Sequence, residues 1–211
     1  QERRRIARDL HDSTGQHLIA ATLIASRIEK TLPAAAQPAL RQLEDMLQQS
    51  IREVRTVSYL LHPPLLDEAG LGLALRHYIE GFLDRSSIAV ELDISPSVER
   101  LAPDTELVLF HVVQEALTNI SRHSKSPTAQ IRLMRERATN GDAVVLTIED
   151  AGKGMPGVRG VRQLIGQKNA PTRGVGLASM RERLQQIGGR LEIDSVVGRT
   201  TVRVVLPIRE P

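Results

Sequence analysis

The chain has 211 residues, 41% of them apolar, and carries a formal net charge of +3. Its length and apolar content suffice for one large or two small folded domains. It contains no cysteine, which excludes disulfides and thiolate chemistry, and no apolar run approaches the ~20 residues of a membrane span. Aromatic residues make up only 2% of the chain. We therefore expect a cytoplasmic fragment of a longer protein, with no direct contact to nucleic acid or membrane.

The first predicted elements are two helices. Apolar residues recur every three or four positions from Ile6 to Leu32 and again from Leu40 to Leu61, with charged residues between them. A proline-containing turn at 33–38 separates the two runs and predicts an antiparallel hairpin. One hairpin buries its apolar stripe only in part. We therefore predict a homodimer through residues 1–62, in which two hairpins form a four-helix bundle.

A domain boundary follows at His62-Pro63-Pro64, because proline cannot continue a helix and restricts the residue before it. We assign residues 63–70 to a linker and residues 71–211 to a second domain. There the periodicity predicts helices at 71–83, 104–123 and 174–187, and strands at 88–94, 129–133, 144–148, 191–193 and 202–206. Helices mixed with antiparallel strands indicate an α+β sandwich, with the helices on one face of the sheet. Residues 151–173, which hold five glycines, predict a long loop that acts as a lid.

The helix predicted at 104–123 has one polar face. Glu115 and Asn119 lie one turn apart and offer oxygen ligands to Mg²⁺. Arg122 and His123 follow them and supply positive charge for phosphate oxygens. A solvated face of an ordinary amphipathic helix explains the same pattern, so this face alone does not define a site.

Two glycine-rich segments follow that helix. Asp150 ends a strand ahead of Gly152 and Gly154, where its carboxylate can accept a hydrogen bond from the amine of adenine. Asp beside Gly is also common in turns. Gly174 and Gly176 open a helix whose free N–H groups suit an anion. The chain has no P-loop, and its glycine spacing does not complete the dinucleotide-binding fingerprint.

Near the start of the chain, His11 is followed at once by Asp12 on an amphipathic helix. A neutral imidazole nitrogen is a nucleophile that can receive a phosphoryl group, and a neighbouring carboxylate orients the ring and stabilises its charged form. By itself, a histidine on a helix is more often an ordinary surface residue.

Together these segments resemble a known family. Three of them look like the N, G1 and G2 boxes of the ATP-binding domain shared by sensor histidine kinases, gyrase and MutL: Gln114-Glu115-Ala-Leu-Thr-Asn119, Asp150-Ala-Gly152-Lys-Gly154 and Gly174-Val-Gly176-Leu177. Residues 2–16 and 62–71 resemble the phosphoacceptor helix and the linker of the NarX and DesK subfamily of histidine kinases. The resemblance covers nearly the whole chain and implies a sandwich of the GHKL (Bergerat) type.

The resemblance implies a sensor histidine kinase core that uses ATP and Mg²⁺. His11 would be the phosphoacceptor, Asp12 the base that takes its proton, and Gln16 the residue that positions water when the partner is dephosphorylated. That partner would be the receiver domain of a response regulator. Asn119 would bind Mg²⁺, with Glu115 near the metal and its waters as a further catalytic residue. Asp150 would bind adenine. Further nucleotide contacts would come from Arg122, His123, Gly152, Gly154, Arg173, Gly174, Val175, Gly176, Leu177 and Thr200.

One segment departs from the family pattern. The Ser-x-x-Gly-x-Gly-Thr run that usually precedes the last strand is one residue short here, between Ser195 and Thr201, so the contacts of that turn are open. Two alternative functions also stay open. One is an ATPase or a serine protein kinase built on the same nucleotide domain, and the other is a catalytically silent module that dimerises and binds nucleotide.

Overall fold

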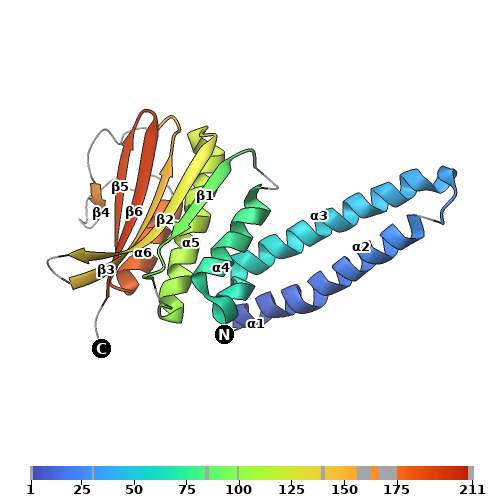
Figure 1. Ribbon diagram of the computed structural model, residues 1–211, viewed down its shortest axis with the longest axis horizontal. Helices are drawn as coiled ribbons and strands as arrows, with labels where there is room; N and C mark the ends of the chain where they lie inside the picture. Colours follow the sequence, from blue (N-terminus) through green and yellow to red (C-terminus); the bar gives the residue numbers. More distant parts are fainter. Residues whose placement is uncertain are drawn as a thin grey trace. The chain divides into compact units, whose positions relative to one another are not determined.

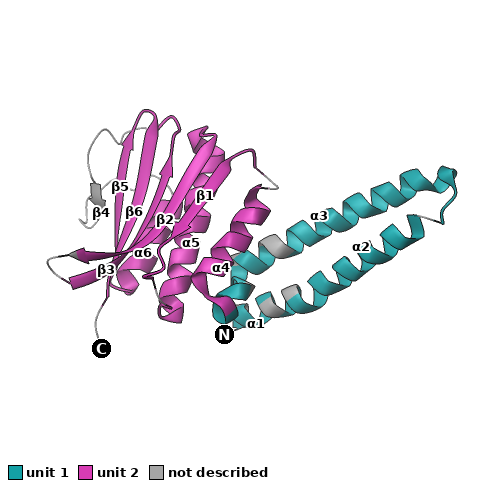
Figure 2. Ribbon diagram, viewed as in Figure 1, with its two compact units in different colours: residues 1–68 teal, residues 69–211 magenta. Residues whose placement is uncertain are grey.

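The computed structural model describes residues 2–29, 31–83, 86–98, 100–138, 141–155, 163–165 and 175–208. The chain divides into two compact units, residues 1–68 and residues 69–211 (Figure 2). None of the helices in the described ranges combines the length and the apolar content that crossing a membrane requires.

The first unit is a helical hairpin (Figure 1). Its first arm consists of α1 (Glu2–Asp9), the π-helical segment η1 (Leu10–Gly15) and α2 (Gln16–Glu29). A short 3₁₀ turn, η2 (Ala34–Ala36), leads into the second arm, α3 (Gln37–Leu61). The hairpin is thus as predicted, but the single regular helix expected from Ile6 to Leu32 is wrong. The apolar spacing widens from Leu10 to Leu18 around Gly15, a residue that weakens a helix, and a π-segment fills this interval.

Small groups of buried residues lie along this unit, including Ala25 and Leu40 near the turn of the hairpin, which are 3% and 7% exposed. Ala7 on α1, Tyr59 on α3 and Leu66 just beyond α3 are at most 6% exposed. Farther along both arms, large apolar side chains are open to solvent, with Leu23 62% and Met46 60% exposed. A hairpin that leaves such side chains exposed has an apolar surface available for a partner.

A third helix, α4 (Pro64–Leu83), contains a break at Gly70, whose φ of 80° lies in the left-handed region that favours glycine. The helix predicted at 71–83 is therefore present after this break. The structure adds helical residues in front of it, from Pro64 onward, because proline fits the first turn of a helix.

The second unit is built on a sheet. Its elements after α4 are β1 (Ala89–Ile94), α5 (Pro103–Asn119), the π-segment η3 (Ile120–Ser124), β2 (Thr128–Ala138), β3 (Gly141–Asp150), β4 (Gln163–Ile165), α6 (Val175–Gln186), β5 (Arg190–Val196) and β6 (Arg199–Pro207). The described strands form one six-stranded sheet in the order β1-β2-β3-β6-β5-β4. Helices α5 and α6 cover one face of it, which confirms the predicted α+β sandwich (Figure 1).

Two details of the sheet correct the sequence-based expectation. The pair β1–β2 is parallel, whereas the sequence predicted antiparallel strands throughout. The intervening helix α5 provides the crossover that a parallel pair requires. The second detail is β4, which pairs with β5 inside the segment 151–173 that was expected to be a loop. The other residues from 156 to 174 lie outside the described residues, and with them most of the expected lid.

The core of this unit lies between the sheet and the helices. Ile131 and Leu133 of β2 alternate with exposed neighbours and are at most 1% exposed. They pair with Ile148 and Leu146 of β3, which are buried to the same extent. Phe110 of α5 is fully buried and makes an edge contact with the ring of Tyr78 at 5.4 Å. This core holds the last turn of α5 and the end of β3 in fixed positions.

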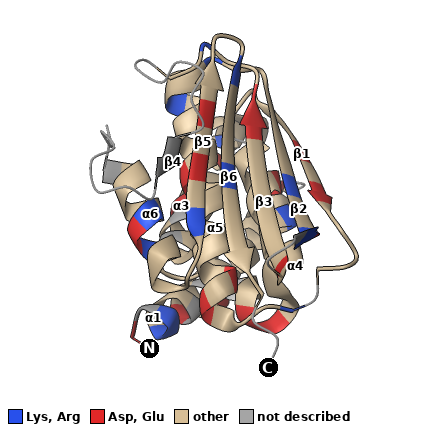
Figure 3. Cartoon of the chain, turned by 90° about the vertical axis from the view of Figure 1, so that its left-hand side faces the viewer, with Lys and Arg blue, Asp and Glu red and all other residues tan. Residues whose placement is uncertain are grey.

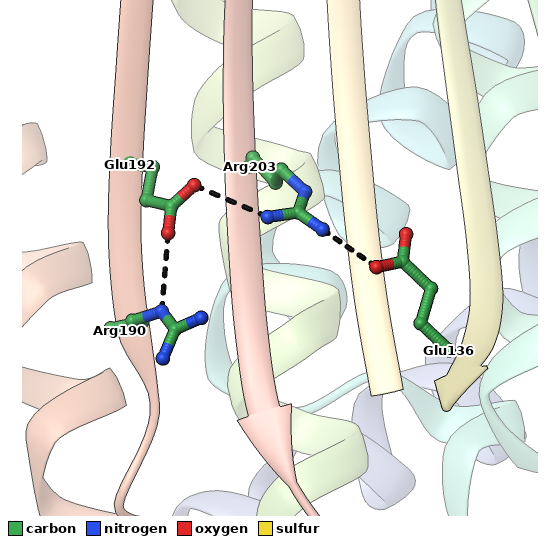
Figure 4. Close-up of polar contacts among 4 residues, drawn as sticks. All are labelled: Glu136, Arg190, Glu192 and Arg203. Carbon is green, nitrogen blue, oxygen red and sulfur yellow. Dashed lines mark hydrogen bonds and ion pairs between the residues drawn. The ribbon is translucent and has the colours of Figure 1, made fainter. Parts of the chain in front are cut away.

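Charged residues occur on several strands of the sheet (Figure 3). Arg203 of β6 pairs with Glu192 of β5 at 3.3 Å and with Glu136 of β2 at 2.7 Å, and Arg190 also pairs with Glu192 (Figure 4). Glu192 is only 7% exposed, so these arginines neutralise a carboxylate that is largely removed from water.

Candidate nucleotide-binding site

The polar face of α5 ends in a carboxylate and an amide that contact each other. The predicted core positions of this helix, from Leu109 to Ile120, are buried, whereas Glu115 and Asn119 are half-buried on the other side. Asn119 Nδ2 donates to Glu115 Oε1 at 3.2 Å. Because Mg²⁺ usually takes one or two protein ligands and completes its shell with phosphate oxygens and water, this pair suits it.

The regular helix is shorter than predicted. It ends at Asn119, and the residues up to Ser124 form the π-segment η3, which stops at Lys125 in the left-handed region with φ 60°. Arg122 and His123 are exposed on this segment. The two ionisable side chains that follow Asn119 are therefore open to solvent.

The start of α6 lies against the Glu115 carboxylate. A Cβ added to Gly176 would be 1.8 Å from Glu115 Oε1, far inside the 3.0 Å below which non-bonded contacts of real Cβ atoms essentially never fall. The N-terminus of α6, with its positive end of the helix dipole, therefore lies directly beside the Glu115–Asn119 pair. Leu177 is half-buried in the first turn of α6, and Val175 begins the helix. Arg173 and Gly174, which the sequence analysis added to this group, lie outside the described residues.

Asp150 is a buried acceptor at the end of β3. It is 6% exposed, and the backbone N–H of Gly152 donates to its Oδ1 at 2.9 Å. Burial raises the pKa of this carboxyl above its usual value. Hydrogen bonds from Gly152 and Ser124 lower the pKa in part, and the charge of Glu149 raises it. A carboxylate that is largely removed from water is stabilised when the amine of a ligand donates a hydrogen bond to it.

Gly152 sits where a side chain has no room. A Cβ there would be 2.4 Å from the Ser124 carbonyl oxygen and 2.7 Å from both Ser124 Cβ and Asp150 Oδ1. The Ser124 carbonyl also accepts the Lys153 N–H at 2.8 Å, which holds it in place. The glycine therefore allows the backbone after β3 to approach the π-segment η3 closely.

The shortened final turn still contacts the segment after Asp150. The Gly198 N–H donates to the Gly152 carbonyl at 2.9 Å, and the Met155 N–H donates to Ser195 Oγ at 2.8 Å. Ser195 is fully buried, and its hydroxyl lies 3.0 Å from that of Thr200, which is the cross-strand partner of Asp150. The turn between Ser195 and Thr201 is thus held against the segment after Asp150 although it is one residue short.

Sequence reasoning missed two serines that hold this region together. Ser124 contributes to the environment of Asp150, and Ser126 Oγ accepts the Ala151 N–H at 2.9 Å. Both are buried. Ser124 ends η3 and Ser126 lies two residues later, and neither belongs to a hydrophobic period, so no pattern in the sequence marks them.

The remaining predicted residues lie in the first unit. His11 and Asp12 belong to η1, and Gln16 begins α2. Asp12 and Gln16 are exposed. The backbone N–H of Gln16 donates to the Ser13 carbonyl, where the π-segment ends.

Comparison with known proteins identifies both units. A family model described as histidine kinase matches residues 2–66, and one described as histidine kinase-, DNA gyrase B-, and HSP90-like ATPase matches residues 104–210. The chain belongs to the histidine kinases. The ATP-binding domain that the sequence resemblance implied is thereby confirmed.

Named relatives are sensor histidine kinases. The chain is 31% identical to MctS of Rhizobium johnstonii over 98% of its own length and 43% of that protein. It is 32% identical to LiaS of Bacillus subtilis over 99% of its length and 54% of the relative. The oxygen sensor NreB of Staphylococcus carnosus is 30% identical over 99% of this chain and 57% of the relative. The chain thus spans about half the length of the curated relatives it matches.

A solved structure supports the fold. The histidine kinase domain of the blue-light activated histidine kinase from Erythrobacter litoralis superposes with a TM-score of 0.52 at 18% identity. The match covers 91% of this chain and 94% of that one.

Proposed function

We propose that this chain is a sensor histidine kinase core that autophosphorylates His11 with ATP. It then transfers the phosphoryl group to an aspartate of a response-regulator receiver domain and also removes it from that partner. The arrangement around Asp150 carries this proposal. A buried acceptor for an amine and the Glu115–Asn119 pair at a helix N-terminus lie in one unit. A histidine followed by an exposed aspartate lies in the other.

The residues present fit ATP and Mg²⁺. Asp150 would accept from the adenine amine, and Gly152 and Gly154, the latter at φ 77°, would shape the pocket. Asn119 would bind the metal, with Glu115 near it, and Arg122 and His123 would face the phosphates. Bound Mg²⁺ would neutralise charge that develops on the phosphate oxygens. Thr200, Val175 and Leu177 would complete the nucleotide contacts, together with Arg173 and Gly174.

In the transfer, a ring nitrogen of His11 would form the new bond to phosphorus while the bond to the ADP oxygen breaks. Asp12 would take the proton from the ring, an assistance typically worth about 10²- to 10⁴-fold in rate. Gln16 lies five residues after His11 and would position the water that removes the phosphoryl group from the regulator.

We further propose that residues 1–62 form the dimerisation and phosphotransfer domain, residues 63–70 the linker and residues 71–211 the catalytic domain. The apolar side chains exposed on α2 and α3 support dimerisation through the hairpin, since a second copy would cover them. We place this core in the cytoplasm, where ATP is available.

Incubation with γ-labelled ATP and Mg²⁺ tests the proposal. The chain should acquire an acid-labile, alkali-stable label, and His11→Gln should abolish it. His17→Gln is the matched control, because His17 is exposed on the next helix and has no assigned role. Release of phosphate without protein label, unchanged in His11→Gln, would instead indicate an ATPase. Label that is acid-stable would indicate a serine kinase, and nucleotide binding with neither product would indicate a silent module. Gln16→Ala should slow removal of phosphate from the regulator and leave labelling of His11 intact.

A further inference from the structure

A closed ring of polar contacts joins three segments of the first unit: α1, the end of α3 and the residues that follow it. The Arg4 guanidinium contacts both carboxylate oxygens of Asp67. Asp67 Oδ2 lies 3.1 Å from His62 Nε2, and the His62 N–H donates to the Ser58 carbonyl at 2.9 Å. The Ser58 hydroxyl donates to the Ala7 carbonyl at 2.9 Å, and Ala7 lies one turn after Arg4. We call these five residues the base ring.

The base ring is more than a surface ion pair. Ser58 and Ala7 are each 1% exposed, and the side chains of His62 and Asp67 are 12% and 18% exposed. Only Arg4, with a side chain 46% exposed, reaches well into solvent. Charge-assisted and bidentate contacts of this kind are stronger than neutral hydrogen bonds, and partial burial protects them from screening by salt.

The base ring contacts the first arm at Ala7, three residues before the π-segment η1 begins. The Ala7 carbonyl accepts the Ser58 hydroxyl at this point, and the helix changes to π geometry three residues later, at Leu10. A side chain that bonds a helical carbonyl is a recognised cause of a local change in helix geometry.

Resting on the proposed function, we infer that the base ring positions the π-segment that carries His11. Arg4, Ser58, His62 and Asp67 are positioning residues, since none belongs to the proposed nucleotide contacts. The ring links the first turn of the phosphoacceptor helix to the residues through which the chain leaves the hairpin. A displacement of either segment therefore changes the geometry of the turn in front of His11.

The test uses the 211-residue chain and compares ring variants with neighbours of the same charge. Arg4→Gln and Asp67→Asn break the ion pair, and Ser58→Ala removes the hydroxyl. Arg5→Gln is the control for Arg4, because the pair that Arg5 makes with Glu2 is open to solvent, with side chains 68% and 69% exposed. Glu68→Gln is the control for Asp67, since Glu68 is the next residue and is exposed.

Three readouts are taken on every variant: the initial rate of His11 labelling, the affinity for ATP, and hydrogen exchange of the amides in residues 2–16. In each ring variant the initial rate of His11 labelling should fall about tenfold, which lies within the roughly 10²-fold loss of rate that a misplacement of 1 Å can cause. Affinity for ATP should stay within about twofold of the parent, the usual scatter of such an assay. Exchange in residues 2–16 should accelerate in the ring variants alone.

Labelling by the ring variants as fast as by their controls would overturn the inference, as would a slower rate fully explained by weaker ATP binding. Arg4→Gln keeps the test valid if Ser58→Ala fails to fold, because Arg4 is the most exposed member of the ring. If the parent itself fails to label His11, the proposed function falls. The exchange data then still show whether the ring holds the helix, so the two failures are distinguishable.

Discussion

Replacing Gly152 with alanine is the sharpest test of the nucleotide site, because it adds one methyl group at the tightest point around Asp150. The new Cβ would be 2.4 Å from the Ser124 carbonyl oxygen and 2.7 Å from Asp150 Oδ1. An ordinary contact with carbon needs about 3.5 Å, so the carbonyl has to retreat by about 1 Å. It cannot do so freely, since it also accepts the Lys153 N–H at 2.8 Å.

Two effects of Gly152→Ala are expected. Overpacking against backbone costs about 1–3 kcal/mol, which for a domain of this size lowers Tm by roughly 3–10 °C. Displacement of the Asp150 carboxylate removes a charge-assisted hydrogen bond to the base, worth about 1.5–3 kcal/mol, or a 10- to 150-fold loss of ATP affinity. Calorimetric titration with ATP and thermal unfolding monitored by circular dichroism measure the two effects separately.

Gly81→Ala is the matched control. Gly81 is helical, and a Cβ there meets nothing within 4 Å, so alanine should leave ATP affinity unchanged and stabilise the helix by up to about 1 kcal/mol. The reasoning would be refuted if Gly152→Ala bound ATP as tightly as Gly81→Ala and unfolded at the same temperature as the parent. That result would mean that the segment after β3 is not held against Ser124.

Three further changes have distinct signatures. Asp150→Asn removes a carboxyl whose pKa is raised in the folded parent. The contribution of this carboxyl to folding stability is present below the usual pKa of 3.8 and is lost as pH rises through the raised pKa. The variant should therefore resist urea better than the parent near neutral pH, by a margin that shrinks as the solution is acidified, while binding ATP more weakly. Gly176→Ala should force the flexible Glu115 carboxylate aside, which slows His11 labelling with little change in Tm, and an unaltered rate would count against a role for Glu115. Arg203→Met leaves the buried Glu192 with Arg190 as its described partner, so urea titration should show a loss of about 1–3 kcal/mol at constant ATP affinity; a loss under about 0.5 kcal/mol contradicts this account.

Local patterns predicted most elements because each has a short-range cause. The hairpin follows from apolar periodicity and the proline-containing turn at 33–38. The π-segments η1 and η3 were not predictable in this way. Each widens a helical turn without changing the composition of the helix. Just before η1, the Ala7 carbonyl of α1 accepts a hydrogen bond from the hydroxyl of Ser58, 51 residues away.

The candidate site shows the same division. Glu115, Asn119 and Asp150, with the glycines near them, indicate nucleotide chemistry only in the combined order that resembles the ATP-binding family, because each segment by itself also fits an ordinary helix face or turn. That the Glu115 carboxylate meets Gly176, and that Ser195 anchors the Met155 backbone, depends on strands and helices brought together from distant parts of the chain.

The sequence by itself determined which chemistry this protein can perform, because periodicity, glycines and ionisable side chains act locally and are visible in one stretch of chain. Only the tertiary structure decided the parallel pairing of β1 with β2, the burial that raises the pKa of Asp150, and the base ring that closes on Arg4. Pairing, desolvation and ring closure all depend on contacts between residues far apart in sequence, and no local pattern encodes such contacts.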